Sequence, residues 1–149
     1  MGKFIWSQWA RLVALVAGAW QFWGALWAIF YRKYFWDFIG GKLGPTGTIA
    51  AGFAAPFVQL IITVPVIQAT CVMCGLVTML LEWPLNPEKV FYRSHIFKIV
   101  FYLPSAVLAA LLYQTADAAV IYLIACLAYT VAIRNGETAN TKAIESSKV

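Results

Sequence analysis

Long apolar segments constrain this chain more than any other feature of its sequence. A bilayer core about 30 Å thick needs roughly 20 apolar residues in a helix, and four segments approach that length: Leu12 to Phe30, Phe57 to Leu81, Ile96 to Leu112 and Ala118 to Ile133. Only 11% of the 149 residues are charged, whereas soluble domains carry about a quarter. The sequence therefore predicts an all-α integral membrane protein with four transmembrane helices.

The last two apolar segments are short, and only Tyr113 to Asp117 separates them. Merging them into one span would bury Asp117 in the bilayer, at a cost of about 2.5 to 3.5 kcal/mol on insertion scales. We therefore expect two helices joined by a tight hairpin, with Gln114, Thr115 and Asp117 at a membrane surface.

The basic residues indicate the orientation of the chain. An even number of spans places both termini on one side, and cytosolic segments carry an excess of lysine and arginine. One side would carry eight basic residues and the other three: Lys3, Arg11, Lys89, Arg93, Lys98, Arg134, Lys142 and Lys148 against Arg32, Lys33 and Lys42. Both termini are therefore expected in the cytosol.

This topology divides the chain into a transmembrane domain, residues 1–134, and a short polar cytosolic tail, residues 135–149. Residues 31–56 then form a lumenal or extracellular segment, in which "YRKYFWDF" suits an interfacial helix and "GGKLGPTG" a loop. Residues 82–95 form a cytosolic loop. The tail is polar and has no apolar period, so we expect it to be mobile.

Glu82, Trp83 and Pro84 lie where the second span reaches the cytosolic surface. Pro84 cannot continue a helix and biases Trp83 away from helical geometry, so the helix is expected to end here. Two interpretations of Glu82 remain open: a solvated carboxylate beside an aromatic anchor, or a carboxylate that pairs with Arg93, Lys98 or a basic residue of a partner.

Helix packing is the simplest interpretation of the other polar and aromatic side chains. Trp20, Trp23 and Trp27 mark one face of the first helix, and small residues such as Gly18 allow close backbone approach. Tyr129 lies within the last span and is expected to hydrogen-bond another helix. Other small residues of this kind are Ala14 and Ala25 in the first span and Ala125, Ala128 and Ala132 in the last.

The titratable residues do not form a recognisable catalytic or metal-binding set. Cys71 and Cys74 lie inside a span without a second pair of ligands, so packing is the expected role. His95 is the only histidine, and a membrane b-type haem needs two axial imidazoles. We expect no catalytic residue, no metal and no cofactor on this chain, and an enzyme using Glu82 and His95 is the least favoured alternative.

The basic residues and the glutamines bear on two further function classes, nucleic-acid binding and transport. The net charge of +5 comes from basic residues scattered singly beside apolar runs, so lipid is the expected partner and nucleic acid is not. Glutamines near the spans could line a substrate path, but without charged companions they more often bond neighbouring helices; these are Gln21, Gln59 and Gln68. A free-standing tetraspan scaffold or small transporter remains the alternative to an accessory subunit.

Four stretches carry a resemblance to a known family: "MGKFIWSQWARLVALVAG", "LLEWP", "FYRSHIFKIVFYLPSAVLAALL" and "AYTVAIRNGE". In order and spacing they resemble the light chain of the phagocyte NADPH oxidase flavocytochrome b, and most closely its smaller fungal NoxD-like relatives. The motif positions that match are Trp6, Trp9, Glu82, Pro84, Pro104, Tyr129, Arg134, Gly136 and Glu137, with Arg93 after a one-residue shift.

The resemblance implies a non-catalytic accessory subunit in a heterodimer with a NADPH oxidase catalytic subunit. Such a subunit supports superoxide and other reactive oxygen production, while haem, FAD and NADPH reside in the partner. It implies residence in the endoplasmic reticulum, the plasma membrane or both. Partner-interface or structural roles are expected for the matched positions and for Gly18 and Trp83.

The chain also departs from the animal members of that family. Their longer basic loop and proline-rich tail, which docks an SH3-containing organiser, are absent, because the tail here lacks P-x-x-P. SH3 domains need that spacing, so no docking of an SH3 organiser through this tail is expected. The segment 31–56 is longer than the first connection of the animal proteins, and its role is open.

Overall fold

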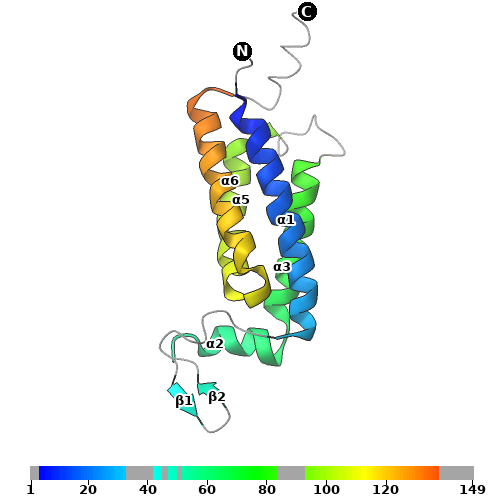
Figure 1. Ribbon diagram of the computed structural model, residues 1–149, viewed down its shortest axis with the longest axis vertical. Helices are drawn as coiled ribbons and strands as arrows, with labels where there is room; N and C mark the ends of the chain where they lie inside the picture. The colour runs from blue at the N-terminus through cyan, green and yellow to red at the C-terminus, as the bar shows by residue number, and fades with distance from the viewer. Residues whose placement is uncertain (1–3, 33–41, 45–46, 50–51, 84–92, 138–149) are drawn as a thin grey trace, which may run out of the picture.

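Four helices lie side by side in the computed structural model, which describes residues 4–32, 42–44, 47–49, 52–83 and 93–137 (Figure 1). They are α1 (Trp6–Phe30), α3 (Val66–Glu82), α5 (His95–Leu111) and α6 (Ala116–Arg134). α1 begins and α6 ends at the same end of the bundle, and α2 (Ala55–Val58) lies at the other end. The helical fold class is confirmed.

The number of membrane spans is established less closely than the helical fold. Two helical stretches, Trp6–Phe30 and Tyr113–Arg134, are long and apolar enough to cross a membrane alone. A bent pair, Ala55–Thr63 with Val66–Glu82, raises the number to three if it forms one span, and α5 is a shorter apolar helix. The described chain therefore has the composition of a membrane protein with two or three candidate spans.

Small residues place α1 in the middle of the bundle. Its buried face consists largely of alanine and glycine, while Trp20, Trp23 and Trp27 point outward and are about half exposed. Small side chains let helix backbones approach closely in a membrane. The expected tryptophan face therefore exists and is about half exposed among the described residues. The helix packs through its small-residue face, which consists of Ala10, Ala14, Ala17, Gly18, Gly24, Ala25 and Ala28.

Gly18 of α1 and Gly75 of α3 lie at a close contact between the two helices. A Cβ built on Gly18 would lie 2.9 Å from the Thr78 side chain, and one built on Gly75 would lie 2.7 Å from the Phe22 backbone nitrogen. No larger residue fits without moving a helix. Glycine is required here by the space between the backbones.

The predicted second span, Phe57 to Leu81, is not one straight helix. The segment of α2 and η1 (Gln59–Thr63, a π-helix) is bent by 79° from α3. Pro65 has no N–H and disfavours helical geometry at the residue before it, and Val64 is extended with φ −125° and ψ 123°. A helix over this whole run is therefore not formed, because Val64-Pro65 interrupts it.

The hairpin expected between the last two helices is confirmed. Leu112 is extended, η2 (Tyr113–Thr115) makes a single 3-10 turn, and α6 begins at Ala116. The Thr115 hydroxyl donates to the Ala109 carbonyl at 2.8 Å, which satisfies an acceptor at the end of α5. Asp117 is exposed in the first turn of α6, where a carboxylate interacts favourably with the positive end of the helix dipole.

The two connections and the tail add smaller corrections. Part of the predicted loop forms an antiparallel pair, β1 (Lys42–Gly44) with β2 (Gly47–Ile49). The expected interfacial helix lies mostly in residues 33–38, outside the described residues. The predicted tail begins inside the fold, because residues 135–137 close the end of α6; residues 138–149 and most of the cytosolic loop lie outside the described part.

Candidate functional site: a buried polar network at the end of the bundle

The Glu82 carboxylate is the centre of a buried network between three helices. Its Oε2 accepts a hydrogen bond from Lys98 Nζ at 2.7 Å, and its Oε1 accepts from the hydroxyls of Tyr129, at 2.6 Å, and Tyr102. Lys98 Nζ also donates to Tyr129 Oη at 3.3 Å. Glu82 and both tyrosines are 0% exposed. The carboxylate thus has one cation and two hydroxyls around it.

This geometry decides between the two interpretations of Glu82. The solvated carboxylate is wrong, because the end of α3 is covered by α5 and α6. The interpretation of Glu82 as a paired carboxylate is confirmed, and its partner is Lys98. Lys98 lies in the first turn of α5, whose N-cap residue is Ser94. Arg93 is exposed. The helix does end at Glu82, as expected, with Trp83 as the C-cap residue.

Arg11 of α1 closes the network from the fourth helix. Its Nε donates to the Glu82 backbone carbonyl at 2.6 Å. The last carbonyls of a helix have no partner within the helix, and a cation there also interacts favourably with the negative end of the helix dipole. All four helices therefore meet at Glu82: α3 supplies it, α5 and α6 bind its side chain, and α1 binds its carbonyl.

A second polar layer lies deeper in the bundle. The Tyr122 hydroxyl donates to Gln21 Oε1 at 2.8 Å and lies 2.9 Å from Thr78 Oγ1. Gln21 Nε2 donates to the Ser105 carbonyl at 3.3 Å. This layer also joins α1, α3, α5 and α6. Gln21 and Gln68 are buried and bonded to neighbouring segments, as expected for packing glutamines, while Gln59 is exposed.

Glu137 joins the two ends of the described chain. Its carboxylate accepts from the backbone nitrogens of Trp6, at 3.2 Å, and Ser7, at 2.8 Å, in the first turn of α1. These nitrogens have no partner within the helix, and a carboxylate is favoured at a helix N-terminus. Glu137 takes the role of a capping residue, since Ile5 at the N-cap position provides no side-chain bond.

Gly136 places Glu137 for this contact. It has φ +68°, a left-handed conformation that glycine adopts without strain. Its nitrogen donates to Ile133 O and the Glu137 nitrogen donates to Ala132 O, which is the Schellman pattern of helix ends. The sequence "RNGE" therefore ends α6 and directs a carboxylate to α1.

The other predicted site residues do not join either network. Gly18 lies at the α1–α3 contact, and the Trp6 side chain is half-buried. Trp9, Trp83, Pro104 and Arg134 are exposed, and Pro84 lies outside the described residues. Exposed aromatic and proline side chains on a membrane bundle are available to lipid or to a partner.

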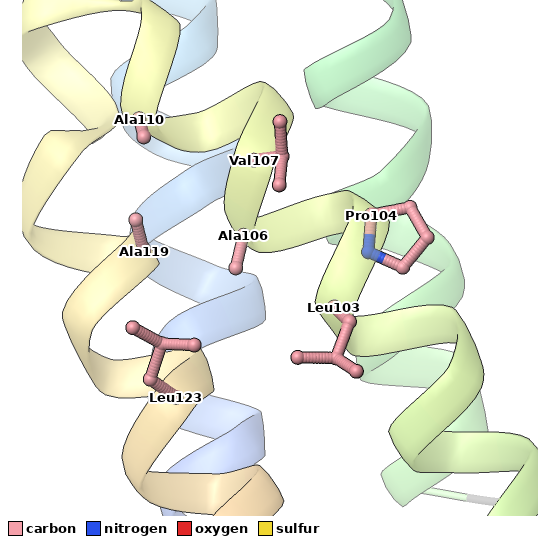
Figure 2. A pocket seen from close by; sticks show the side chains of 7 residues that line it. All are labelled: Leu103, Pro104, Ala106, Val107, Ala110, Ala119 and Leu123. Atoms are coloured by element: carbon pink, nitrogen blue, oxygen red, sulfur yellow. The ribbon is translucent and has the colours of Figure 1, made fainter.

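Pro104 lines an apolar groove of about 400 Å³ on the outer side of α5 and α6. Figure 2 shows Leu103 and Leu123 projecting from the two helices, with small alanines between them. Every lining residue is apolar: Leu103, Pro104, Ala106, Val107, Ala110, Ala119 and Leu123. The groove offers shape and apolar surface but no group for acid–base or nucleophilic chemistry.

His95 and the cysteines have packing environments. The His95 ring lies 5.2 Å from the Tyr129 ring, measured between centroids, and both of its nitrogens are buried without a hydrogen-bond partner among the described residues. Cys71 packs with Ile61 and Leu112 in a cluster at the α2 end of the bundle. All three cysteines are free thiols.

Comparison with known proteins gives one assignment. A family model described as "Domain of unknown function (DUF7727)" matches residues 1–137. The chain belongs to that family. The match contains all four bundle helices and both polar networks. No curated protein and no solved structure matches the chain. The family description carries no activity, so function has to be argued from the geometry.

Several residues of the networks were missed at the sequence level. Tyr102 and Thr78 look like ordinary members of apolar spans. A usable signal was present, because Lys98 lies inside an apolar helix and a charge there needs a partner. Its spacing of four residues from Tyr102 places both on one helix face.

Proposed function

We propose that this chain is a non-catalytic subunit that binds and stabilises the catalytic subunit of a membrane NADPH oxidase. It would thereby support superoxide production, with haem, FAD and NADPH held by the partner in a heterodimer. The proposal includes four membrane spans with cytosolic termini, and residence in the endoplasmic reticulum, the plasma membrane or both.

One observation carries this proposal: the four stretches that resemble the flavocytochrome light chain meet at one end of the bundle. The first stretch supplies Arg11, the second Glu82, the third Lys98 and the fourth Tyr129. These stretches are far apart in sequence, yet their polar residues form one network. This shared network supports the proposal that the four stretches act as one structural unit.

The distribution of polar groups supports a binding role. In the described bundle the network side chains bond to one another, and the outward surfaces of α1, α5 and α6 are apolar. Helices in a membrane associate through packing of such surfaces and through interhelical hydrogen bonds. The tryptophan face of α1 and the groove of α5 and α6 are the surfaces that we propose for the oxidase helices.

The orientation follows from the charges at the two ends. Arg11, Arg93 and Arg134 lie toward the end that holds the Glu82 network, and Arg32 follows the other end of α1. The excess of basic residues favours the cytosol for the Glu82 end. The mechanism needs no reaction on this chain, since binding only the folded partner stabilises that partner by mass action.

Purification from native cells tests the proposal. Tagged protein would be isolated in mild detergent, followed by an absorption spectrum and partner identification by mass spectrometry. We expect a b-type haem spectrum together with a NADPH oxidase chain. A haem-free preparation without oxidase, from cells that express one, would contradict the proposal and favour an oxidase-independent scaffold or transporter.

A further inference from the structure

The segment of α2 and η1, residues 55–63, lies across the end of the bundle instead of continuing α3 (Figure 1). The bend of 79° between this segment and α3 makes the two nearly perpendicular. If α3 follows the membrane normal, the segment lies close to the membrane plane. This arrangement has no counterpart in the predicted straight span.

The bend is fixed by side chains on both sides of it. Arg32 donates to the carbonyls of Ile62, at 3.0 Å, and Thr63, at 3.4 Å. Gln68 donates to the carbonyls of Ile61, at 2.8 Å, and Ala28, at 3.4 Å. The break at Val64-Pro65 leaves the carbonyls of Ile61, Ile62 and Thr63 without helical donors, and the two side chains replace them. Hydrogen bonds to the rest of the fold therefore hold the segment of α2 and η1 in its bent position.

The two sides of this segment differ in what covers them. Ala54 and Ile61 are buried against Ala28 and Ile67 of the bundle. The rest of the segment exposes five large apolar side chains, by 41–71%, with Gln59 and Thr63 exposed among them: Phe53, Phe57, Leu60, Ile62 and Val64. An apolar surface of this extent is unfavourable in water and marks contact with lipid or protein.

The length of α3 gives the depth of the segment. Its 17 residues extend roughly 26 Å at 1.5 Å per residue, which is less than a hydrocarbon core of about 30 Å. α3 can reach the far surface only if it begins at the near boundary, so residues 55–63 lie at that boundary. The exposed aromatic rings of Trp27, Phe30 and Tyr31 end α1 at the same level, as an interfacial aromatic belt does.

We propose that residues 53–64 form a membrane-surface platform whose exposed side chains insert among lipid acyl chains just below the head groups. The occupant is lipid, because α3 is long enough to cross the hydrocarbon core only if this segment lies at the boundary of that core. The proposal rests on the membrane topology proposed above and not on the oxidase partner. The Arg32 guanidinium, exposed at the same level, fits the head-group zone.

Depth measurements on the full chain test this platform. Spin labels would be placed singly at Phe57, Leu60 and Ile62 in a cysteine-free background, and the protein reconstituted in phosphatidylcholine vesicles. Accessibility to oxygen and to a water-soluble nickel complex then gives the depth of each label. We expect no steady change of depth from residue 57 to residue 62, whereas a straight span would separate these two residues by roughly 7.5 Å.

A matched series on α6 separates the possible failures. Labels at Val120 and Leu127, both exposed, are expected to differ in depth by roughly 10 Å. Without that difference the membrane topology is wrong, and the platform falls with it. A steady depth gradient across residues 57–62 would overturn the platform alone, and so would labels there that the nickel complex reaches and oxygen does not. Whether an oxidase binds this chain is tested separately, by the purification from native cells.

A second measurement avoids the cysteine replacements, which could disturb the buried Cys71. A photo-crosslinking phenylalanine derivative at Leu60 in the otherwise native chain is expected to label phospholipid in the same vesicles. The same group at buried Ile61 serves as the control and is expected to give less than a tenth of that lipid labelling. Equal lipid labelling at the two positions would contradict the sided platform.

Discussion

Glu82 Oε2 lies 2.7 Å from Lys98 Nζ in a pair whose side chains are almost fully removed from solvent. Replacing such a pair by apolar residues is often neutral, whereas removing one partner leaves a buried charge uncompensated. The pair also specifies how α3 and α5 pack, because any arrangement that separates the two groups leaves a buried charge without a partner. We infer that it fixes one arrangement of the helices at the end where the resembling stretches converge.

Breaking the pair from one side is expected to be costly. Glu82→Gln leaves the Lys98 ammonium buried without its counter-charge, and the expected loss of stability is about 3–5 kcal/mol. Thermal unfolding in detergent, followed by near-ultraviolet circular dichroism, measures it. The double variant Glu82→Gln with Lys98→Met removes both charges and is expected to recover part of the loss. If Glu82→Gln alone is as stable as the native chain, the Glu82 carboxylate is solvated and the buried pair is not formed.

Close approach of α1 and α3 predicts a second effect. Gly75→Ala places a methyl group 2.7 Å from the Phe22 backbone nitrogen and Gly18→Ala places one 2.9 Å from Thr78. Overpacking of this kind costs about 1–3 kcal/mol, and more at Gly75, where the contacted atoms are backbone. Gly52→Ala is the matched control, because a Cβ there meets nothing within 4 Å. Equal melting temperatures for all three variants would contradict the close contact.

The contact between Glu137 and α1 predicts a graded loss. Glu137→Ala removes the acceptor for the Trp6 and Ser7 nitrogens, with an expected cost of about 0.5–2 kcal/mol. Glu137→Gln keeps one acceptor oxygen and is expected to lose less. Amide hydrogen exchange at Trp6 and Ser7 reports the same contact locally. Unchanged exchange in Glu137→Ala would show that the cap is not formed.

Arg32 provides a prediction for the bend before α3. Arg32→Ala removes the donor to the Ile62 and Thr63 carbonyls, so faster amide exchange is expected in residues 55–66. Arg32→Lys retains a cation and one donor and is expected to lie between the native chain and Arg32→Ala. Exchange at Ser105 and Tyr129, in the other half of the bundle, serves as the internal control and is expected to stay unchanged.

The sequence predicted the helical class, the α5–α6 hairpin and the end of α3 because these depend on local features. Apolar length sets the helices, Asp117 cannot be buried in a span, and Pro84 prevents continuation beyond Trp83. The bend at Val64-Pro65 was missed because its neighbours are all apolar and hydropathy does not register a missing backbone donor. The proline was the available signal.

The candidate site was predicted only in part. Glu82 and Tyr129 were both singled out as polar groups in need of a partner, and Lys98 was one of the named possibilities. Tyr102 was not identified, since a tyrosine in an apolar helix has the same pattern whether it faces lipid or the bundle. Which helix faces meet is a property of packing between distant segments, and one sequence does not contain it.

We propose that this chain maintains a NADPH oxidase, and removal of the chain from native cells tests that role. Oxidase abundance, membrane b-type haem and superoxide release would be measured in cells without the chain, and after return of the native chain or Glu82→Gln. We expect loss of all three quantities on removal, full recovery with the native chain and partial recovery with Glu82→Gln. Unchanged oxidase abundance and superoxide release after removal would contradict it.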